Sequence, residues 1–222
     1  TAGMEPSIAL SYNSQSGEGI AGYGWNIAGL SSISRVSKTY FDDGYSQGIE
    51  LNSSDNYALD GNKFKLNGTS AVVTQNNASH KVTPFGNIGG SPEWFRAEAT
   101  DGTILEYGRT SDARFMDDNG NTTIMWNINK IYDQYGNYIA FTYNNSDRQP
   151  RIEKIVYTGN ANAGLSPYNE INFYYNFKSG SEEYDVYLAG ASIKSKYILR
   201  KIAVKSHNNT FREYELAYNK DF

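Results

Sequence analysis

Hydrophobic and polar residues alternate with a period of two along most of the chain. Ile8, Leu10 and Tyr12 alternate with small residues, and Phe64 and Leu66 alternate with lysines. Successive side chains of a strand point to opposite faces, so this period predicts strands that bury one face. The same pattern predicts strands within residues 31–40, 128–132, 138–143, 152–157, 171–177, 196–205 and 211–218. In all we expect about fifteen short strands, at the regular spacing of meandering β-structure.

Turn sequences with Asp, Asn or Gly separate these segments, at residues 42–44, 60–62, 67–68, 101–102, 119–121, 135–137 and 158–160. Such residues readily adopt the left-handed backbone that two-residue hairpin turns require, so most neighbouring strands are expected to pair antiparallel. No segment shows a sustained helical period. Residues 180–192 come nearest, but glycine near both ends favours a loop. We therefore expect almost no helix.

These patterns predict an all-β fold of antiparallel hairpins in meandering, curved or twisted sheets. The 222 residues suit one large β-module over residues 1–222, because β-sandwiches and β-barrels reach this length as single domains. Residues 75–91 contain a proline and three glycines and are expected to be irregular, as are residues 144–150. The first of these stretches is the expected boundary if the module has two sub-regions, 1–90 and 91–222.

Composition narrows the function classes. The net charge is −4, which argues against nucleic-acid binding because phosphate backbones need a concentrated basic surface. The chain has no cysteine, so disulfides and thiolate metal sites are excluded. No apolar run is long enough for a membrane-spanning helix, and the first residues lack the features of a signal peptide. The start of the chain is expected to be a cut inside a longer protein.

One acidic turn has oxygen ligands that a calcium ion accepts. Asp117, Asn119 and Asn121 place side-chain oxygens at alternate positions, and residues 42–44 offer two further aspartates. Neither turn is followed by the glutamate that completes an EF-hand loop. An Asx turn explains both segments without a metal. We therefore predict no bound metal or cofactor, with calcium at Asp117, Asn119 and Asn121 as the weaker alternative.

No motif assembles a catalytic site, and we predict that the protein is not an enzyme. His80 and His207 have no nearby ligands or nucleophile partners in the sequence. Residues 17–22 give a loose glycine-rich phosphate loop, but an acidic residue interrupts it and no helix is expected to follow. Glu213 and Glu215 form the Glu-x-Glu pair typical of ADP-ribosyltransferases, yet alternation places both on the solvent-facing side of a strand.

Ordered motifs extend over nearly the whole chain. They are residues 6–14 (PSIALSYNS), 22–26 (GYGWN), 32–35 (SISR), 56–66 (NYALDGNKFKL), 94–96 (WFR) with 101–102 and 107–108, 126–143, and 157–160 with 165–168. Together they resemble the N-terminal domain of SpvB-type proteins (Salmonella virulence plasmid B) and of insecticidal toxin complex B components. Residues 131–137 also resemble one YD repeat of an RHS protein.

The resemblance implies a virulence-related, RHS/YD-shell-like β-module that acts as a non-catalytic structural scaffold and houses or docks a toxin or effector region. Its implied partners are other parts of the same polypeptide or a C-component-like protein. In addition, unpaired strand edges would allow the chain to associate with a second copy of itself. The implied location is secreted or on the bacterial cell surface, with the cytoplasm before export. The alternatives are a carbohydrate- or protein-binding β-module, favoured by the 19 tyrosines, and an ADP-ribosyltransferase fragment.

Overall fold

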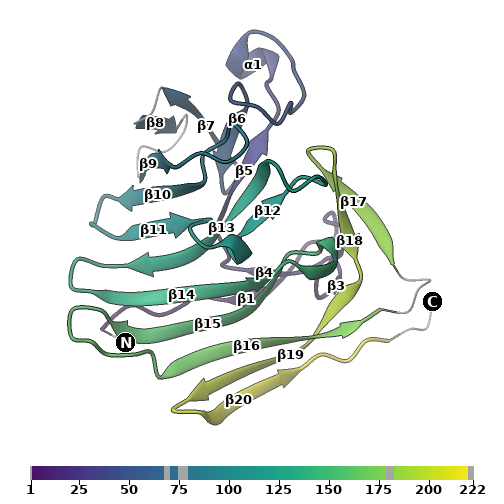
Figure 1. Ribbon diagram of the computed structural model, residues 1–222. Helices are drawn as coiled ribbons and strands as arrows, with labels where there is room; N and C mark the ends of the chain where they lie inside the picture. The colour runs from purple at the N-terminus through teal and green to yellow at the C-terminus, as the bar shows by residue number, and fades with distance from the viewer. Residues whose placement is uncertain (1, 68–70, 75–79, 179–182, 220–222) are drawn as a thin grey trace. The chain divides into compact units, whose positions relative to one another are not determined.

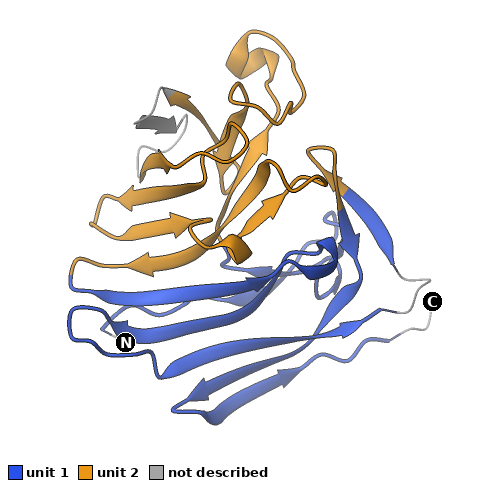
Figure 2. Ribbon diagram, in the orientation of Figure 1, with its two compact units in different colours: residues 1–30, 135–186, 193–222 blue, residues 31–134, 187–192 orange. Residues whose placement is uncertain are grey.

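The computed structural model describes residues 2–67, 71–74, 80–178 and 183–219 (Figure 1). The fold is nearly all β, with 57% strand and 5% helix. Its sheets are antiparallel, as the register of fifteen strand pairs shows. The predicted all-β fold of antiparallel hairpins is confirmed. Contacts divide the chain into two compact units (Figure 2): unit 1 comprises residues 1–30, 135–186 and 193–222, and unit 2 comprises residues 31–134 and 187–192.

Unit 2 contains a closed ring of strands. Its strands are β5 (Ser32–Val36), β6 (Asn56–Leu59), β7 (Asn62–Asn67), β8 (Ala71–Thr74), β9 (His80–Phe85), β10 (Trp94–Ala99), β11 (Ile104–Tyr107), β12 (Arg114–Met116) and β13 (Thr123–Tyr132). The pairing order is β5-β6-β7-β8-β9-β10-β11-β13, and β13 also pairs with β5, so the ring closes. The helical turn α1 (Tyr40–Asp43) follows β5, and η1 (Ser111–Ala113) precedes β12, which pairs with β13.

Aromatic side chains form the core of unit 2. Tyr57 of β6, Phe64 of β7, Phe95 of β10 and Trp126 of β13 are each at most 1% exposed. The centroids of their contacting rings lie 5.0 to 6.2 Å apart, and such pairs stabilise a core by roughly 0.5–1.5 kcal/mol each beyond simple burial. The Arg35 guanidinium of β5 lies over the rings of Tyr57 and Trp126. These aromatic rings therefore pack around a buried guanidinium.

The long strands of unit 1 pair in the order β14-β15-β16-β19-β20, which is part of the one large sheet of the chain. Its elements are β1 (Ala9–Tyr12), β2 (Glu18–Gly19), β3 (Gly22–Tyr23), β4 (Trp25–Ala28), β14 (Asn137–Asn144), η2 (Ser146–Arg148), β15 (Arg151–Asn160), β16 (Asn169–Phe177), β19 (Tyr197–Ser206) and β20 (Asn209–Glu215). β1 pairs with β4, and β2 pairs with β3. A further hairpin, β17 (Tyr184–Leu188) with β18 (Ala191–Ser195), has its tip at residues 187–192, which belong to unit 2.

The glycine-rich opening segment is tied to the C-terminal part of unit 1. The Lys178 ammonium lies 2.6 Å from a Glu18 carboxylate oxygen and 2.8 Å from the Ser195 hydroxyl oxygen. The Tyr184 hydroxyl donates to the Glu18 carbonyl at 2.9 Å. Because the Lys178 side chain is only 3% exposed, these partners offset the cost of burying its charge. Residues 17–24 thus form a packed hairpin, and no helix follows them to build a phosphate loop.

Residues 158–160 lie inside β15 and do not form the predicted turn. Thr158 has a φ of 75°, and the register between β14 and β15 shifts near this point. A Cβ on Gly159 would lie 2.4 Å from Cζ of Tyr138 on the neighbouring strand. The glycine therefore accommodates a cross-strand aromatic ring at a bulge.

Residues 42–44 also differ from the predicted hairpin turn, because they end the short helix α1. Thr39 caps this helix: its hydroxyl oxygen accepts a hydrogen bond from the Asp42 amide at 3.3 Å, as serine and threonine N-caps commonly do. Gly44 ends it with a φ of 75°. The Asp-Gly pair therefore closes a helical turn instead of a hairpin.

Two stretches that the sequence predicts to be irregular contain strands. Within residues 75–91, of which 75–79 lie outside the described residues, β9 includes Pro84. On one side Pro84 lies opposite Phe95 of β10, and between the described residues of β8 and β9 the register places Val72 opposite Val82. Residues 180–192, of which 180–182 are not described, include the β17–β18 hairpin. Its Ala189-Gly190 turn has φ values of 52° and 80°, typical of a two-residue hairpin.

The contact units do not follow the chain order of the predicted sub-regions 1–90 and 91–222. Residues on both sides of position 90 form β9 and β10, which pair with each other inside unit 2. Unit 1 combines residues from both ends of the chain with a central segment. A single module over residues 1–222 stays a prediction.

Candidate functional site

The predicted calcium ligands lie in one turn, which the Asp117 side chain closes. One Asp117 carboxylate oxygen accepts hydrogen bonds from the backbone amides of Asn121 (2.7 Å) and Thr122 (2.9 Å). Asn119 lies in the same turn, where the Gly120 amide donates to the Asp117 carbonyl at 3.0 Å. No group of three or more His, Asp or Glu side chains placed to hold a metal exists among the described residues. Calcium at Asp117, Asn119 and Asn121 stays a prediction.

Lysines neutralise the second acidic pair, Asp42 and Asp43. The Asp43 carboxylate lies 2.7 Å from the Lys63 ammonium and 2.6 Å from that of Lys65. It also accepts a hydrogen bond from the side-chain NH₂ group of Asn56 at 2.9 Å. Burial alone would raise the pKa of the Asp43 carboxyl, but these hydrogen bonds outweigh it and lower that pKa well below its usual value. The cluster fixes α1 against β7.

Acid should weaken this cluster. The pKa of Asp43 is lower in the folded chain than its unfolded value near about 4, so its contribution is complete above that pH and disappears as the pH falls. We expect Asp43→Asn to lower the free energy of unfolding by about 1–3 kcal/mol at neutral pH, with a smaller difference from the unmodified chain in acid. Denaturant unfolding of both chains, from neutral to acid pH, measures this difference in the free energy of unfolding. A difference that is equal at both ends of the range would contradict the role of the charge.

The two histidines and the Glu-x-Glu pair lie on different elements. His207 follows β19 in unit 1 and stacks on Tyr168, with ring centroids 4.5 Å apart, whereas His80 begins β9 in unit 2. Glu213 and Glu215 lie on the same face of β20, as alternation predicts, opposite Ala203 and Lys201. Both are exposed, and Glu213 pairs with Lys201 at 3.1 Å. His207 and Tyr168 also line a small pocket of about 250 Å³, together with Glu170.

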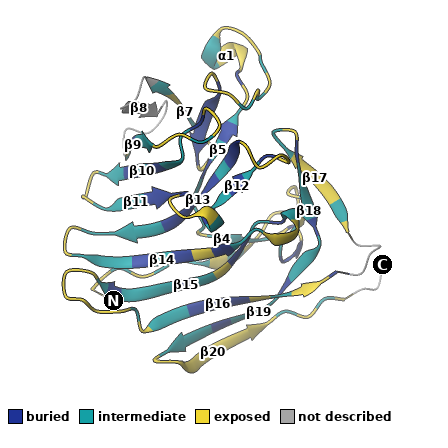
Figure 3. Cartoon of the chain, in the orientation of Figure 1, coloured by how far each residue is buried: buried dark blue, intermediate teal, exposed yellow. Residues whose placement is uncertain are grey.

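The outer strand of unit 1 presents an open edge. β20 pairs only with β19 among the strands of the described chain, and all seven of its residues are exposed (Figure 3). The Leu216 amide donates to the Arg200 carbonyl of β19 at 2.9 Å. Backbone groups alternate between the two sides of a strand, so those of Tyr214 also face β19 while those of Glu213 and Glu215 face outward. These outward groups form an unpaired strand edge.

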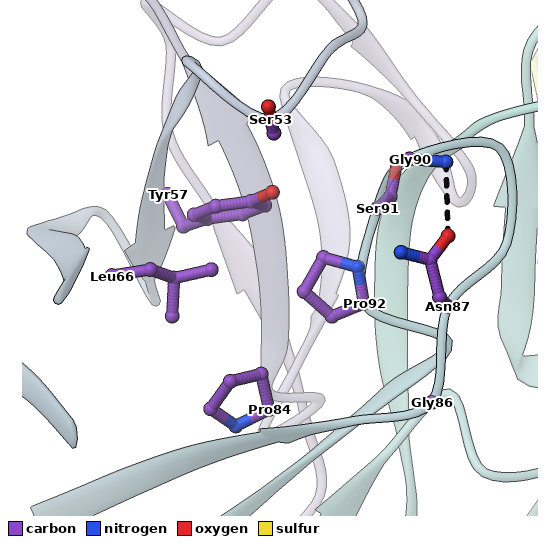
Figure 4. A pocket seen from close by; sticks show the side chains of 9 residues that line it. All are labelled: Ser53, Tyr57, Leu66, Pro84, Gly86, Asn87, Gly90, Ser91 and Pro92. Carbon is purple, nitrogen blue, oxygen red and sulfur yellow. Dashed lines mark hydrogen bonds between the residues drawn. The ribbon is translucent and has the colours of Figure 1, made fainter. Parts of the chain in front are cut away.

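Unit 2 contains a cavity of about 490 Å³, which we name the Tyr57 cavity (Figure 4). The described residues that line it are Ser53, Tyr57, Leu66, Pro84, Gly86, Asn87, Gly90, Ser91 and Pro92. Figure 4 shows the Tyr57 ring between Leu66 and Pro92, with its hydroxyl directed towards the side of Ser91. This volume lies in the usual range of small-molecule pockets, about 300–1,000 Å³.

Tyr57 is the distinctive residue of this cavity. Its side chain is buried, with 1% exposure, yet no described residue hydrogen-bonds its hydroxyl. Burial raises the pKa of the phenol, so the group stays a neutral hydroxyl. The hydroxyl lies at the wall of the cavity, where it can donate a hydrogen bond to a ligand and accept one from it.

Sequence reasoning missed this cavity. Its lining comes from four separate segments, at residues 53–57, 66, 84–87 and 90–92, which only the closed ring of strands brings together. The one local signal was the cluster of glycine and proline in residues 84–92, because such clusters mark loops.

Comparisons with known proteins agree with the fold. The profile of the family described as Salmonella virulence plasmid 65kDa B protein matches residues 1–86 and 72–199. The solved N-terminal domain of effector protein SpvB from Salmonella typhimurium strain LT2 aligns with a TM-score of 0.73 and 17% identity, over 98% of this chain and 95% of that one. No curated protein matches the chain.

Two toxin structures share the same fold. TcdB2-TccC3-Cdc42 aligns with a TM-score of 0.72 and 14% identity, over 92% of this chain and 12% of that chain. The Photorhabdus luminescens Tc holotoxin pore aligns with a TM-score of 0.70 and 15% identity, over 97% and 13%. This chain therefore spans only a small part of those toxin chains. No helix in the described ranges is long and apolar enough to cross a membrane.

Proposed function

The chain belongs to the Salmonella virulence plasmid 65kDa B protein family, and from this we propose that it is a non-catalytic structural module of a bacterial toxin-complex-B-like or RHS-type protein. In this role it contributes a wall segment to a larger β-structure that houses or docks a toxin or effector region. Its partners are other parts of the same polypeptide or a C-component-like protein. The proposed location is outside the cell or on its surface.

One observation carries this proposal: the open edge of β20. A strand edge with free amides and carbonyls accepts another strand, and proteins that stay single usually protect such edges. β20 has seven exposed residues and no proline. The charged residues of β20 are of both signs, namely Arg212, Glu213 and Glu215. The edge therefore repels neither a basic nor an acidic strand strongly.

Hydrogen exchange tests whether the edge is covered in an assembly. The amides of Glu213 and Glu215 should exchange rapidly in the chain alone and at least about 100-fold more slowly in the full polypeptide or its complex with a C-component-like protein, because a new strand would bond them. Equal exchange rates in both forms would rule out the edge as the joint. A concentration-dependent dimer of the isolated chain with protected β20 amides would place a second copy there.

A proline at an outward position provides a selective variant. Glu213→Pro removes an amide that faces away from β19, so the chain should keep its fold while assembly falls by at least about tenfold. Glu213→Gln keeps the amide and removes only the charge, and it should assemble normally. If both variants assemble equally well in co-purification, backbone pairing at this edge is not the docking mode.

A further inference from the structure

The Tyr57 cavity combines hydroxyl and amide groups with apolar walls. Tyr57, Ser53 and Ser91 contribute hydroxyls, and Asn87 contributes a carboxamide. The Asn87 side-chain oxygen accepts from the Gly90 amide at 3.1 Å, which leaves its NH₂ group available to a ligand. Leu66, Pro84 and Pro92 supply the apolar part. The lining thus combines four polar side chains with three apolar ones, and polar groups in a pocket fix the orientation of a ligand.

The lining favours a neutral ligand. No acidic or basic side chain lines the cavity among its described residues. Arg35 lies behind Ser91, but its guanidinium already donates to Ser91, Asp55 and the Thr123 carbonyl. Because Asp55 balances this charge at 2.5 Å, little of the positive field is left for an anion.

The surrounding strands disfavour a peptide. Extended peptides bind most often by adding a strand to an open sheet edge, and the strands that carry Tyr57, Leu66 and Pro84 are each paired on both sides within the ring. Hydroxyls that both donate and accept instead complement a ligand whose own hydroxyls do the same. We propose that the Tyr57 cavity binds a neutral carbohydrate residue, with the Tyr57 hydroxyl as its central hydrogen-bonding group.

Saturation-transfer NMR and calorimetry with the full chain test this proposal directly. The probes are glucose, galactose, mannose, N-acetylglucosamine and N-acetylgalactosamine, each up to about 10 mM, since single sugars are expected to bind weakly. At least one should bind, and Tyr57→Phe should weaken that binding about five- to tenfold, which corresponds to one lost hydrogen bond. Ser53→Trp, at the exposed rim, should block it.

Tyr107→Phe is the matched control. Tyr107 is equally buried in unit 2, but its hydroxyl lies 2.9 Å from that of Ser31 and outside the cavity. Its removal should leave sugar binding unchanged, although it removes an existing hydrogen bond. Three results would overturn the proposal: no probe binds to the folded chain, binding survives both Tyr57→Phe and Ser53→Trp, or Tyr107→Phe weakens binding as much as Tyr57→Phe. Because β20 is not involved, the scaffold proposal does not depend on this outcome.

Discussion

Replacing Asp55 by alanine is expected to lower the free energy of unfolding by about 3–5 kcal/mol, because it leaves a buried guanidinium without its counter-charge. The Arg35 side chain is 0% exposed and that of Asp55 2%, with Nη1 and Oδ2 2.5 Å apart. The Asp55 carboxylate also accepts the backbone amides of Glu50 and Leu51, both at 2.9 Å. These amides would lose their acceptor as well. Denaturant unfolding measures the change.

An exposed ion pair supplies the control for this variant. Lys194 and Asp185 are 2.5 Å apart, but their side chains are 38% and 37% exposed, so Asp185→Ala should change the free energy of unfolding by less than about 1 kcal/mol. Replacing both buried partners, Arg35→Met with Asp55→Leu, should recover most of the loss, since no unpaired charge remains. Equal effects of Asp55→Ala and Asp185→Ala would contradict the assigned role of burial.

The long strands could be predicted from the sequence because their signal is local. Residues 138–143 and 171–177 alternate cleanly, and the structure has β14 and β16 there. The short β17–β18 hairpin differs from the prediction, because the glycines near both ends of residues 180–192 favour a loop, although Tyr184, Val186 and Leu188 alternate. Alternation over three positions is weak unless the turn beside it is recognised.

Closure of the unit 2 ring could not be predicted, because it depends on contacts between segments far apart in the chain. β13 pairs with β5 through Trp126 and Ile33, and with β11 through Ile131 and Leu105. Alternation places a side chain on a face but does not name the strand opposite it. The candidate sites divide in the same way between local and long-range signals. The exposed position of Glu213 and Glu215 could be deduced from one strand, whereas the Tyr57 cavity forms only when the ring of strands closes.

Replacing Trp126 by alanine is expected to lower the free energy of unfolding by about 3–5 kcal/mol, through lost burial and the cavity that remains. Trp126 is 0% exposed and contacts Tyr57 and Phe95, with ring centroids 5.7 and 5.0 Å apart. Its indole NH donates to the carbonyls of Pro92 and Glu93 at 3.2 and 3.1 Å. Denaturant unfolding followed by near-ultraviolet circular dichroism measures the loss and reports the aromatic core directly.

Three comparisons separate the causes of this loss. Trp126→Phe keeps a ring but removes the NH donor, and should lower the free energy of unfolding by about 1–3 kcal/mol. Trp25→Ala, at a position 43% exposed, should have an effect smaller than about 2 kcal/mol. A Trp126→Ala effect no larger than that of Trp25→Ala would contradict a central place in the core. Arg35 lies over the Trp126 ring at 5.9 Å and pairs with Asp55, and residues that share a partner are coupled. The Trp126→Ala and Asp55→Ala losses should therefore not add: the double variant should lose less free energy of unfolding than the sum of the two single losses.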